Sequence, residues 1–185
     1  MAMEMRRMAH LNLALEVKRI IEVELERDDF TFLLEQPDNE TDIVLEKDYE
    51  AGVNYKMPVV VIDINETSSE PFEMGGGVID VGEFIIDVIC VNKPESMDVA
   101  EALIRNLLGE HNFYDFNRDG NVPDLNVAYD PATLPSTILT SWNTTEEDFI
   151  QSNLKLTNAV QPNFAKRYSS MIEGRIRYLR SFEKS

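Results

Sequence analysis

The chain has 185 residues, of which 43% are hydrophobic and 28% charged, and this composition indicates one soluble globular domain rather than a disordered or fibrous protein. Its 17 basic and 34 acidic residues give a net charge of −17, which repels phosphate backbones and anionic membranes and argues against a sequence-reading nucleic-acid binder. The single cysteine excludes an internal disulfide framework, and no apolar stretch approaches the ~20 residues of a membrane span, so we expect a cytoplasmic protein.

An amphipathic helix is the first element that the sequence predicts. From Leu11 onward, apolar residues recur at helical spacing with charged residues on the other face, and the pattern ends near Asp28. Two short candidate strands follow at residues 30–34 and 43–45. Because turn-forming residues 36–39 separate them, we expect a small hairpin beside the helix.

A long hairpin is predicted next. Residues 58–64 are β-branched and apolar on both faces, which is typical of a central strand covered on two sides, and Pro58 is tolerated at its start. The partner strand is predicted over residues 82–91. Between them, the glycine-containing segment 68–77 is expected to form a mobile tip.

A second helix follows this hairpin in the prediction. Either Asn92 or Ser96 can cap it, apolar residues from Met97 to Leu108 form one stripe, and Gly109 marks its end.

The remainder of the chain is interpreted as an elaboration followed by a last strand. Residues 111–163 are rich in Asn, Asp, Thr and Pro and hold possible strands at 125–129, 137–140 and 153–157. Residues 168–182 alternate apolar and charged side chains, which favours a strand over a helix. We therefore predict a single α+β domain over residues 1–185, with a mixed, mostly antiparallel sheet, a long hairpin and two flanking helices.

Charge is distributed unevenly along the chain. Residues 1–27 are neutral, residues 28–163 carry nearly all of the negative charge, and residues 164–185 are basic. This basic end has two interpretations: it folds back on its own domain as a strand whose charges meet acidic neighbours, or it meets the acidic face of an adjacent copy. Head-to-tail contact of the second kind, repeated with a closing rotation, makes a ring.

One motif suggests a cation site. Asp115, Asn117 and Asp119 match the opening of a Ca²⁺-binding EF-hand loop, but the closing glutamate position holds Asn126 and Pro123 breaks the exit helix. An acidic Ca²⁺-binding module is therefore an alternative to an ordinary Asx turn, and we otherwise expect no cofactor.

Catalytic groups do not form a recognisable set. The only histidines, His10 and His111, make neither a nucleophile pair nor a metal triad with Cys90. A carboxylate-based hydrolase would need two of the many acidic residues to converge in a pocket, and no motif indicates that they do. We do not expect an enzyme.

The order of these elements resembles that of the tail-terminator and head–tail joining (neck) proteins of tailed bacteriophages. The resembling parts are the helix at 11–26, the Pro-led strand at 57–61, the long loop, the strand at 83–91 and the helix at 96–108, together with the last strand. Segment 111–163 departs from the compact members of that family. The resemblance implies a structural protein of the virion, assembled in the host cytoplasm, that forms a usually hexameric ring. Such a ring caps the finished tail and joins it to the head, with its hairpin loops facing the central channel.

Particular residues follow from this resemblance. The implied partners are further copies of the chain, a tail tube or sheath protein, neck or connector proteins, and DNA that passes through without specific binding. An acidic channel wall would repel phosphates instead of holding them. The channel-facing candidates are Glu66, Glu70, Glu73 and Asp80. The inter-subunit candidates are Arg175, Arg177 and Arg180. Tube terminator, sheath terminator and neck adaptor all remain open as roles.

Overall fold

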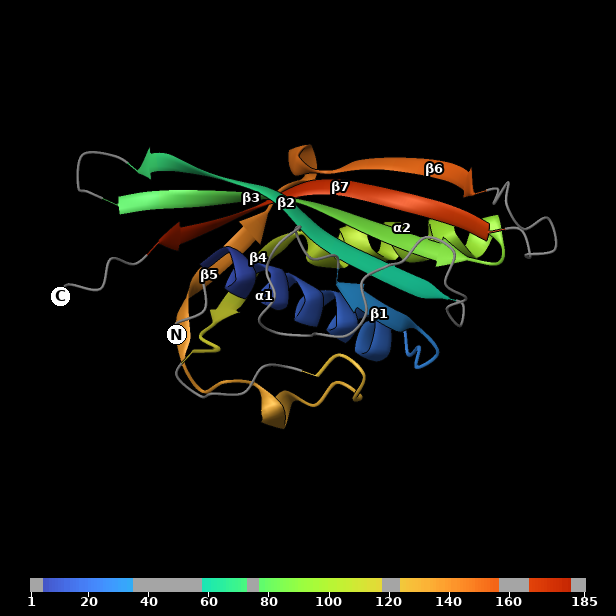
Figure 1. Cartoon of the computed structure of the whole chain (residues 1–185), viewed down its shortest axis with the longest axis horizontal. Coiled ribbons are helices and arrows are strands. Elements are labelled where there is room, and N and C mark those ends of the chain that lie inside the picture. The colour runs from blue at the N-terminus through green and yellow to red at the C-terminus, as the bar shows by residue number, and fades with distance from the viewer. Residues whose placement is uncertain (1–4, 35–57, 73–76, 118–123, 157–166, 181–185) are drawn as a thin grey trace.

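The computed structural model describes residues 5–34, 58–72, 77–117, 124–156 and 167–180, which form an α+β fold with helices against one face of a curled sheet (Figure 1). The helices are α1 (Met5–Arg19), which continues into a π-helical turn (Ile20–Glu24), and α2 (Lys93–Leu107). The strands are β1 (Thr31–Leu34), β2 (Val59–Phe72), β3 (Gly77–Cys90), β4 (Gly109–Tyr114), β5 (Ile138–Thr144), β6 (Ile150–Leu156) and β7 (Arg167–Arg180). Two 3-10 turns, Pro131–Thr133 and Glu146–Asp148, lie in the connections.

Seven strands form the sheet within the described residues, in the order β1-β2-β3-β7-β5-β4, and β6 also pairs with β7. The β1–β2 pair is parallel and the other pairs are antiparallel, as the predicted mixed, mostly antiparallel sheet requires. Strands β6 and β5 share one edge of β7, where Gln151 pairs with Ile172 and Trp142 pairs with Tyr178. The C-terminal strand therefore lies inside the sheet, between β3 and these two strands.

Helix α1 is the central helix of the fold. It was predicted to be amphipathic, but even Lys18 is only 3% exposed. Its ammonium nitrogen lies 2.8 Å from Glu22 and 3.0 Å from the carbonyl oxygen of Leu125, and it sits 4.4 Å from the ring centroid of Phe32. The connection between β4 and β5 thus covers the face that the sequence assigned to solvent, and its Leu125 carbonyl satisfies the buried cation.

Helix α2 begins and ends as predicted. The side chain of Asn92 accepts a hydrogen bond from the backbone N–H of Glu95 at 2.8 Å, so Asn92 rather than Ser96 is the cap. Gly109, with φ of 106°, follows the helix in the left-handed region that favours glycine.

The long hairpin is confirmed and is longer than predicted. Strands β2 and β3 pair from Val59 with Ile89 to Phe72 with Gly77, so most of the segment expected to be a mobile tip is strand. The tip itself, residues 73–76, lies outside the described residues.

The smaller elements differ more from expectation. β1 pairs in parallel with β2, and residues 43–45 of the expected hairpin lie outside the described residues. Residues 125–129 are not a strand, because Val127 donates back to Asp124 at 3.3 Å in a turn. Strand β4 was not predicted, whereas β5 and β6 fall near the strands expected at 137–140 and 153–157.

The core lies between the sheet and the helices. Alternate residues of β2, β3 and β7 contribute Ile62, Phe84, Ile86 and Ile172 to it, and all four are at most 1% exposed. A smaller apolar cluster on the other face of the sheet consists of Leu33, Val59, Val61 and Ile89. The central strand is thus apolar on both faces, as its composition predicts.

Candidate functional site

Three strand ends extend together past the helices and are named the arm here (Figure 1). The arm consists of residues 66–72 of β2, 77–83 of β3 and 174–180 of β7. A β-bulge between Ile64 and Glu66 marks its base, where such bulges bend a strand. Arg6 of α1 donates from Nη2 to the carbonyl oxygen of Ile64 at 2.9 Å, so the first turn of α1 is tied to the base of the arm.

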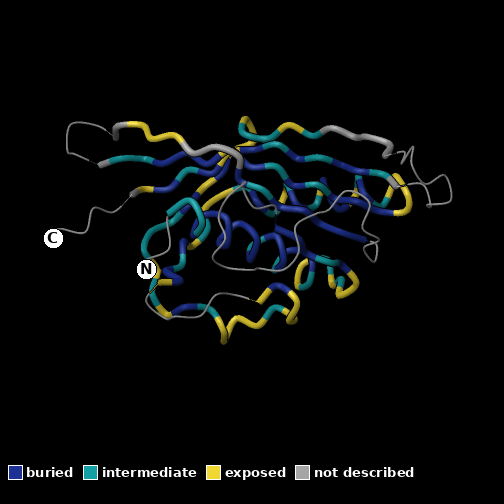
Figure 2. The backbone as a smooth tube through the Cα atoms, in the orientation of Figure 1, coloured by how far each residue is buried: buried dark blue, intermediate teal, exposed yellow. Residues whose placement is uncertain are grey.

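The outer face of the arm points away from α1 and α2. Because paired residues of neighbouring strands share a face, the register places Glu83 beside Arg175, and Ile79 between Glu70 and Leu179. Exposed stretches mark β2 and the end of β7 in this part of the molecule (Figure 2). Acidic hairpin residues and basic residues of the last strand, which the sequence assigned to separate surfaces, thus lie on one face.

Arg175 and Arg177 each contact a carboxylate of their own chain. The Nε atom of Arg175 lies 3.3 Å from Glu83 Oε1, and these side chains are 55% and 48% exposed, so the pair contributes at most ~1 kcal/mol. Arg177 Nη1 lies 2.6 Å from Asp148 Oδ2, whose side chain is 5% exposed. Burial raises the pKa of Asp148, but hydrogen bonds from Arg177 and Thr145 outweigh it and hold that pKa below its usual value. In the single chain the basic strand therefore folds back on its own domain, which is the first of the two interpretations of the basic C-terminal segment.

Asp80 lies on the inner face of the arm instead of the exposed one. It is 2% exposed, and its Oδ1 atom accepts a hydrogen bond from the Ser69 hydroxyl at 2.7 Å. A carboxylate buried in this way does not line an open surface of the single chain. For Glu66 and Arg180 only the strand positions are described, and Glu73 lies outside the described residues.

The proposed calcium loop is described only in part. Asp115 is 5% exposed and its Oδ1 atom accepts the backbone N–H of Asn117 at 3.0 Å, which is an Asx turn. Asp119 lies outside the described residues. In the part of the chain that is described, no group of three or more His, Cys, Asp or Glu side chains is placed to hold a metal ion.

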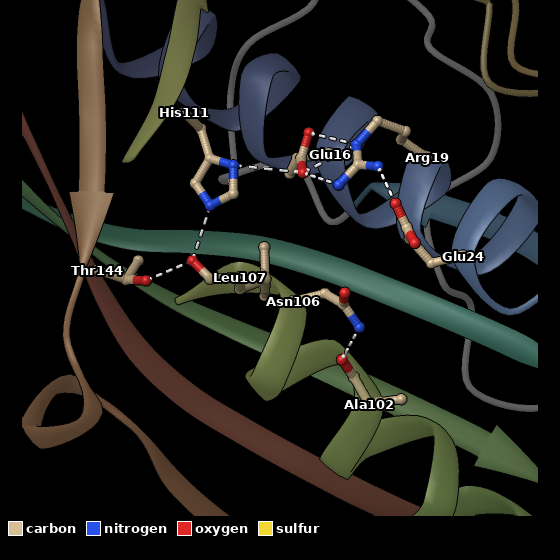
Figure 3. A network of polar contacts seen from close by, with 8 residues as sticks. All are labelled: Glu16, Arg19, Glu24, Ala102, Asn106, Leu107, His111 and Thr144. Carbon is tan, nitrogen blue, oxygen red and sulfur yellow. Dashed lines mark hydrogen bonds and ion pairs between the residues drawn. The ribbon is translucent and has the colours of Figure 1, made fainter. Parts of the chain in front are cut away.

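A polar cluster, missed by the sequence analysis, joins α1, the end of α2 and strands β4 and β5 (Figure 3). His111 Nδ1 lies 3.3 Å from Glu16 Oε1, and its Nε2 atom lies 2.8 Å from the carbonyl oxygen of Leu107. Arg19 donates to the same carboxylate from Nη2 at 2.6 Å. Thr144 donates to the same Leu107 carbonyl at 2.5 Å. These residues are too far apart in sequence for any spacing to indicate them.

This cluster offers no free catalytic base. Both ring nitrogens of His111 are engaged, and the ring packs on Trp142 with centroids 4.4 Å apart. Burial lowers the pKa of His111, but the hydrogen bonds to Glu16 and Leu107 and the charge of Glu16 outweigh it, so the pKa is raised. The residues lining the adjacent pocket of about 270 Å³ include no serine, cysteine or lysine that would act as a nucleophile.

The other candidates from the sequence do not join this cluster. Burial lowers the pKa of His10 to about 4, and its Nε2 atom lies 2.8 Å from the carbonyl oxygen of Ile62. Burial, followed by the charge of Glu95, raises the pKa of the Cys90 thiol to about 12, which keeps it protonated. A cleft of about 700 Å³ between α1 and residues 124–136 contains Lys18, whose charge is already paired with Glu22.

No protein-family model matches the sequence, and no curated protein matches it significantly. Neither described helix combines the length and apolar character that crossing a membrane requires. A functional assignment therefore depends on the arrangement of the described residues and on the resemblance in element order.

Proposed function

We propose that this chain is a structural virion protein whose copies form a ring, expected to be hexameric, that terminates a bacteriophage tail and joins it to the head. The observation that carries the proposal is the arm, a three-stranded extension that leaves a helix-backed body and presents charged groups of both signs. A ring needs head-to-tail contacts between two different surfaces of each copy. An arm at one end of the molecule supplies one such surface.

The second surface is the acidic turn that follows α1. Glu24, Glu26 and Asp28 are all exposed there, and this segment follows the C-terminal end of α1, away from the arm (Figure 1). On this proposal the outer face of one arm, with Arg175 exposed, contacts the acidic turn of the next copy. Charge complementarity of this kind directs encounter and orientation more than it adds affinity.

The overall charge suits a channel that passes DNA. With a net charge of −17, a ring of such chains repels phosphates and displaces no counterions from the DNA. DNA would therefore move through the ring without being held. Glu70, which is exposed on the arm, is the described channel-facing candidate, together with the hairpin positions of Glu66 and Glu73. The tail tube or sheath protein and the neck proteins are the proposed neighbours.

Neck adaptor and sheath terminator are the alternative roles of the same ring. Purified protein added to separately assembled tail tubes, contracted sheaths and DNA-filled heads distinguishes them by the end to which it binds in electron micrographs. A Ca²⁺-binding module is the alternative of another class. It predicts heat release on titration with CaCl₂, and an Asp115→Asn chain would then lose that signal.

The ring itself is tested by particle mass. Sedimentation and native mass spectrometry should give a closed oligomer, and Arg175→Glu should shift it to monomers because the exposed arginine would then face an acidic turn. Adding Asp28→Lys to that variant should restore the ring. Arg105→Glu, at an exposed position on α2, is the matched control and should leave the mass unchanged.

Two observations together would contradict ring formation. Unmodified chains that stay monomeric at high concentration, and that also fail to bind the ends of assembled tails, would not be ring-forming terminators. If the ring persists in Arg175→Glu, the protein still assembles, but the outer face of the arm is not part of the contact between copies.

A further inference from the structure

One side chain of the β4–β5 hairpin, His111, contacts both helices. Asn12 of α1 also exchanges hydrogen bonds with the backbone of Tyr114 in β4, at 2.8 and 3.1 Å, and Thr144 of β5 donates to the Leu107 carbonyl. The His111 ring reaches Glu16 of α1 on one side and the Leu107 carbonyl at the end of α2 on the other (Figure 3). Its third contact is the ring of Trp142 in β5. Three elements therefore meet at a single titratable group.

The two polar partners of His111 are both hydrogen-bond acceptors. A carboxylate such as that of Glu16 accepts only, and so does a backbone carbonyl. Leu107 is the last residue of α2, so its carbonyl belongs to the end of the helix that carries partial negative charge. A ring with acceptors at both nitrogens is satisfied only when both nitrogens carry a proton, which is the imidazolium form.

Other charged and titratable groups around the ring are few and largely engaged. From α1, Arg19 is held by three hydrogen bonds to Glu16 and one to Glu24. The remaining titratable groups that line the same pocket are Glu110 and Tyr114 of β4 and Tyr129 of the following loop. Among the described residues that line this pocket, Arg19 is the cation facing His111, and it is neutralised by the carboxylate on which the imidazolium also depends.

The hairpin held by His111 contacts the β7 strand of the arm itself. Phe113 of β4 packs against Tyr178 of β7 with ring centroids 4.9 Å apart. In β5, Trp142 pairs with Tyr178 and Asn143 pairs with Arg177. Movement of the hairpin away from the helices would therefore loosen β7 within the arm.

We propose that His111 is a proton-controlled latch that fixes the β4–β5 hairpin to the two helices and thereby holds the arm in place. When the ring loses one proton, its bare nitrogen faces an acceptor with no hydrogen between them, so the contact to either Glu16 or the Leu107 carbonyl becomes repulsive, although Arg19 and Thr144 still donate to these two acceptors. The latch is a property of each copy and does not depend on ring formation.

The direction of the pH effect follows from the raised pKa of His111. Its stabilisation is complete below the ordinary histidine value of about 6.5 and is lost as pH rises through the higher value of the folded chain. The latch is therefore closed in mildly acidic solution and opens toward alkaline pH. Each unit by which the pKa is raised corresponds to about a tenfold change in the opening equilibrium.

Trp142 makes the latch measurable, because it is the only tryptophan of the chain and packs on His111. An imidazolium in contact with an indole quenches its fluorescence more than a neutral imidazole does. Emission of the intact protein should rise with pH, with a midpoint above 6.5 for the unmodified chain. The midpoint should fall in Glu16→Gln, and the transition should vanish in His111→Gln.

His10 provides the matched control, since it is the only other histidine and its pKa of about 4 lies outside the window. A His10→Gln chain should keep the midpoint. Hydrogen exchange, corrected for its intrinsic pH dependence, should accelerate above the midpoint in β4, in β5 and in β7 around Tyr178, and His111→Gln should show the faster rates at every pH.

Two results would overturn the latch. One is a fluorescence midpoint at or below pH 6.5 in the unmodified protein. This test does not depend on the folding of any variant. The other is a normal midpoint with no change in exchange at β7, which would leave His111 as a titrating residue without any control of the arm.

Discussion

Gly174 of β7 lies directly beneath the ring of Phe84 in β3. The two residues are paired in register, and Phe84 is 1% exposed. A Cβ atom at position 174 would lie 2.4 Å from Cζ and 2.9 Å from Cε2 of that ring. Carbon atoms in favourable contact are about 3.5–4.0 Å apart. The ring therefore occupies the space that any side chain at position 174 would need.

We expect Gly174→Ala to destabilise the protein for this reason. Displacing a packed ring costs about 1–3 kcal/mol, as other overpacked cores do. Alanine recovers about 0.4–1 kcal/mol by restricting the unfolded chain. The net loss is then about 0–2.6 kcal/mol, and the middle of that range, ~1.3 kcal/mol, lowers Tm by roughly 3–5 °C for a chain of this size.

Urea denaturation with a matched glycine measures this loss. Gly82→Ala is the control, because its new Cβ would lie 3.3 Å from Cγ1 of Ile176, a side-chain atom that can shift by a few tenths of an ångström. Adding Phe84→Leu to Gly174→Ala should recover about 1 kcal/mol relative to the sum of the two single changes. If Gly174→Ala costs no more than Gly82→Ala, and the double variant is additive, the ring does not fill that space.

Two further substitutions test buried charges. Arg177→Met leaves the nearly buried carboxylate of Asp148 unpaired, so urea denaturation at pH 7 should show a loss of about 1–3 kcal/mol, and adding Asp148→Asn should recover part of it. Because the folded-state pKa of Asp148 is lowered, the contribution of this pair should fade in the unmodified chain as pH drops below about 4. Lys18→Met removes the positive charge that pairs with Glu22 and the donor to the Leu125 carbonyl, and it should cost about 3–5 kcal/mol by the same assay, whereas Lys93→Met at an exposed position should stay within about 0.5 kcal/mol. An equal effect of the two lysine changes would contradict the buried pairing.

Periodicity predicted the elements that make up the core. The apolar stripe of α2, the Asn92 cap, the β-branched run of β2 and the alternation of β7 each depend on neighbours in the sequence. These local patterns also indicated the long β2–β3 hairpin, although its strands continue to Phe72 and from Gly77. The prediction made these strands too short, because their ends are stabilised by pairing with neighbouring strands and not by a local apolar pattern.

Contacts between distant residues account for what the sequence missed. Lys18 was assigned to solvent, yet it is buried by a loop more than a hundred residues later, at Leu125. The cluster around His111 likewise joins residues whose spacing carries no signal. Strand β4 has no period-two alternation of its own, and it pairs with β5 from Gly109 opposite Thr144. Tertiary pairing rather than intrinsic preference forms it.

The basic C-terminal segment illustrates how a block of charge in the sequence differs from a charged surface. β7 pairs with β3 from Tyr168 to Arg180, and with β6 and β5 along most of its other edge. Its backbone is therefore not available to add a strand from another copy, and a contact through β7 must use side chains such as Arg175.

Side-chain ion pairs at a surface weaken with salt, whereas backbone pairing between strands does not depend on salt in this way. Dissociation of the ring between about 0.1 and 1 M NaCl, where the screening length falls from about 10 Å to 3 Å, is thus the expected outcome of contact through the arm. A ring that is indifferent to salt would instead indicate pairing at a strand edge, and β6 would be the first edge to examine.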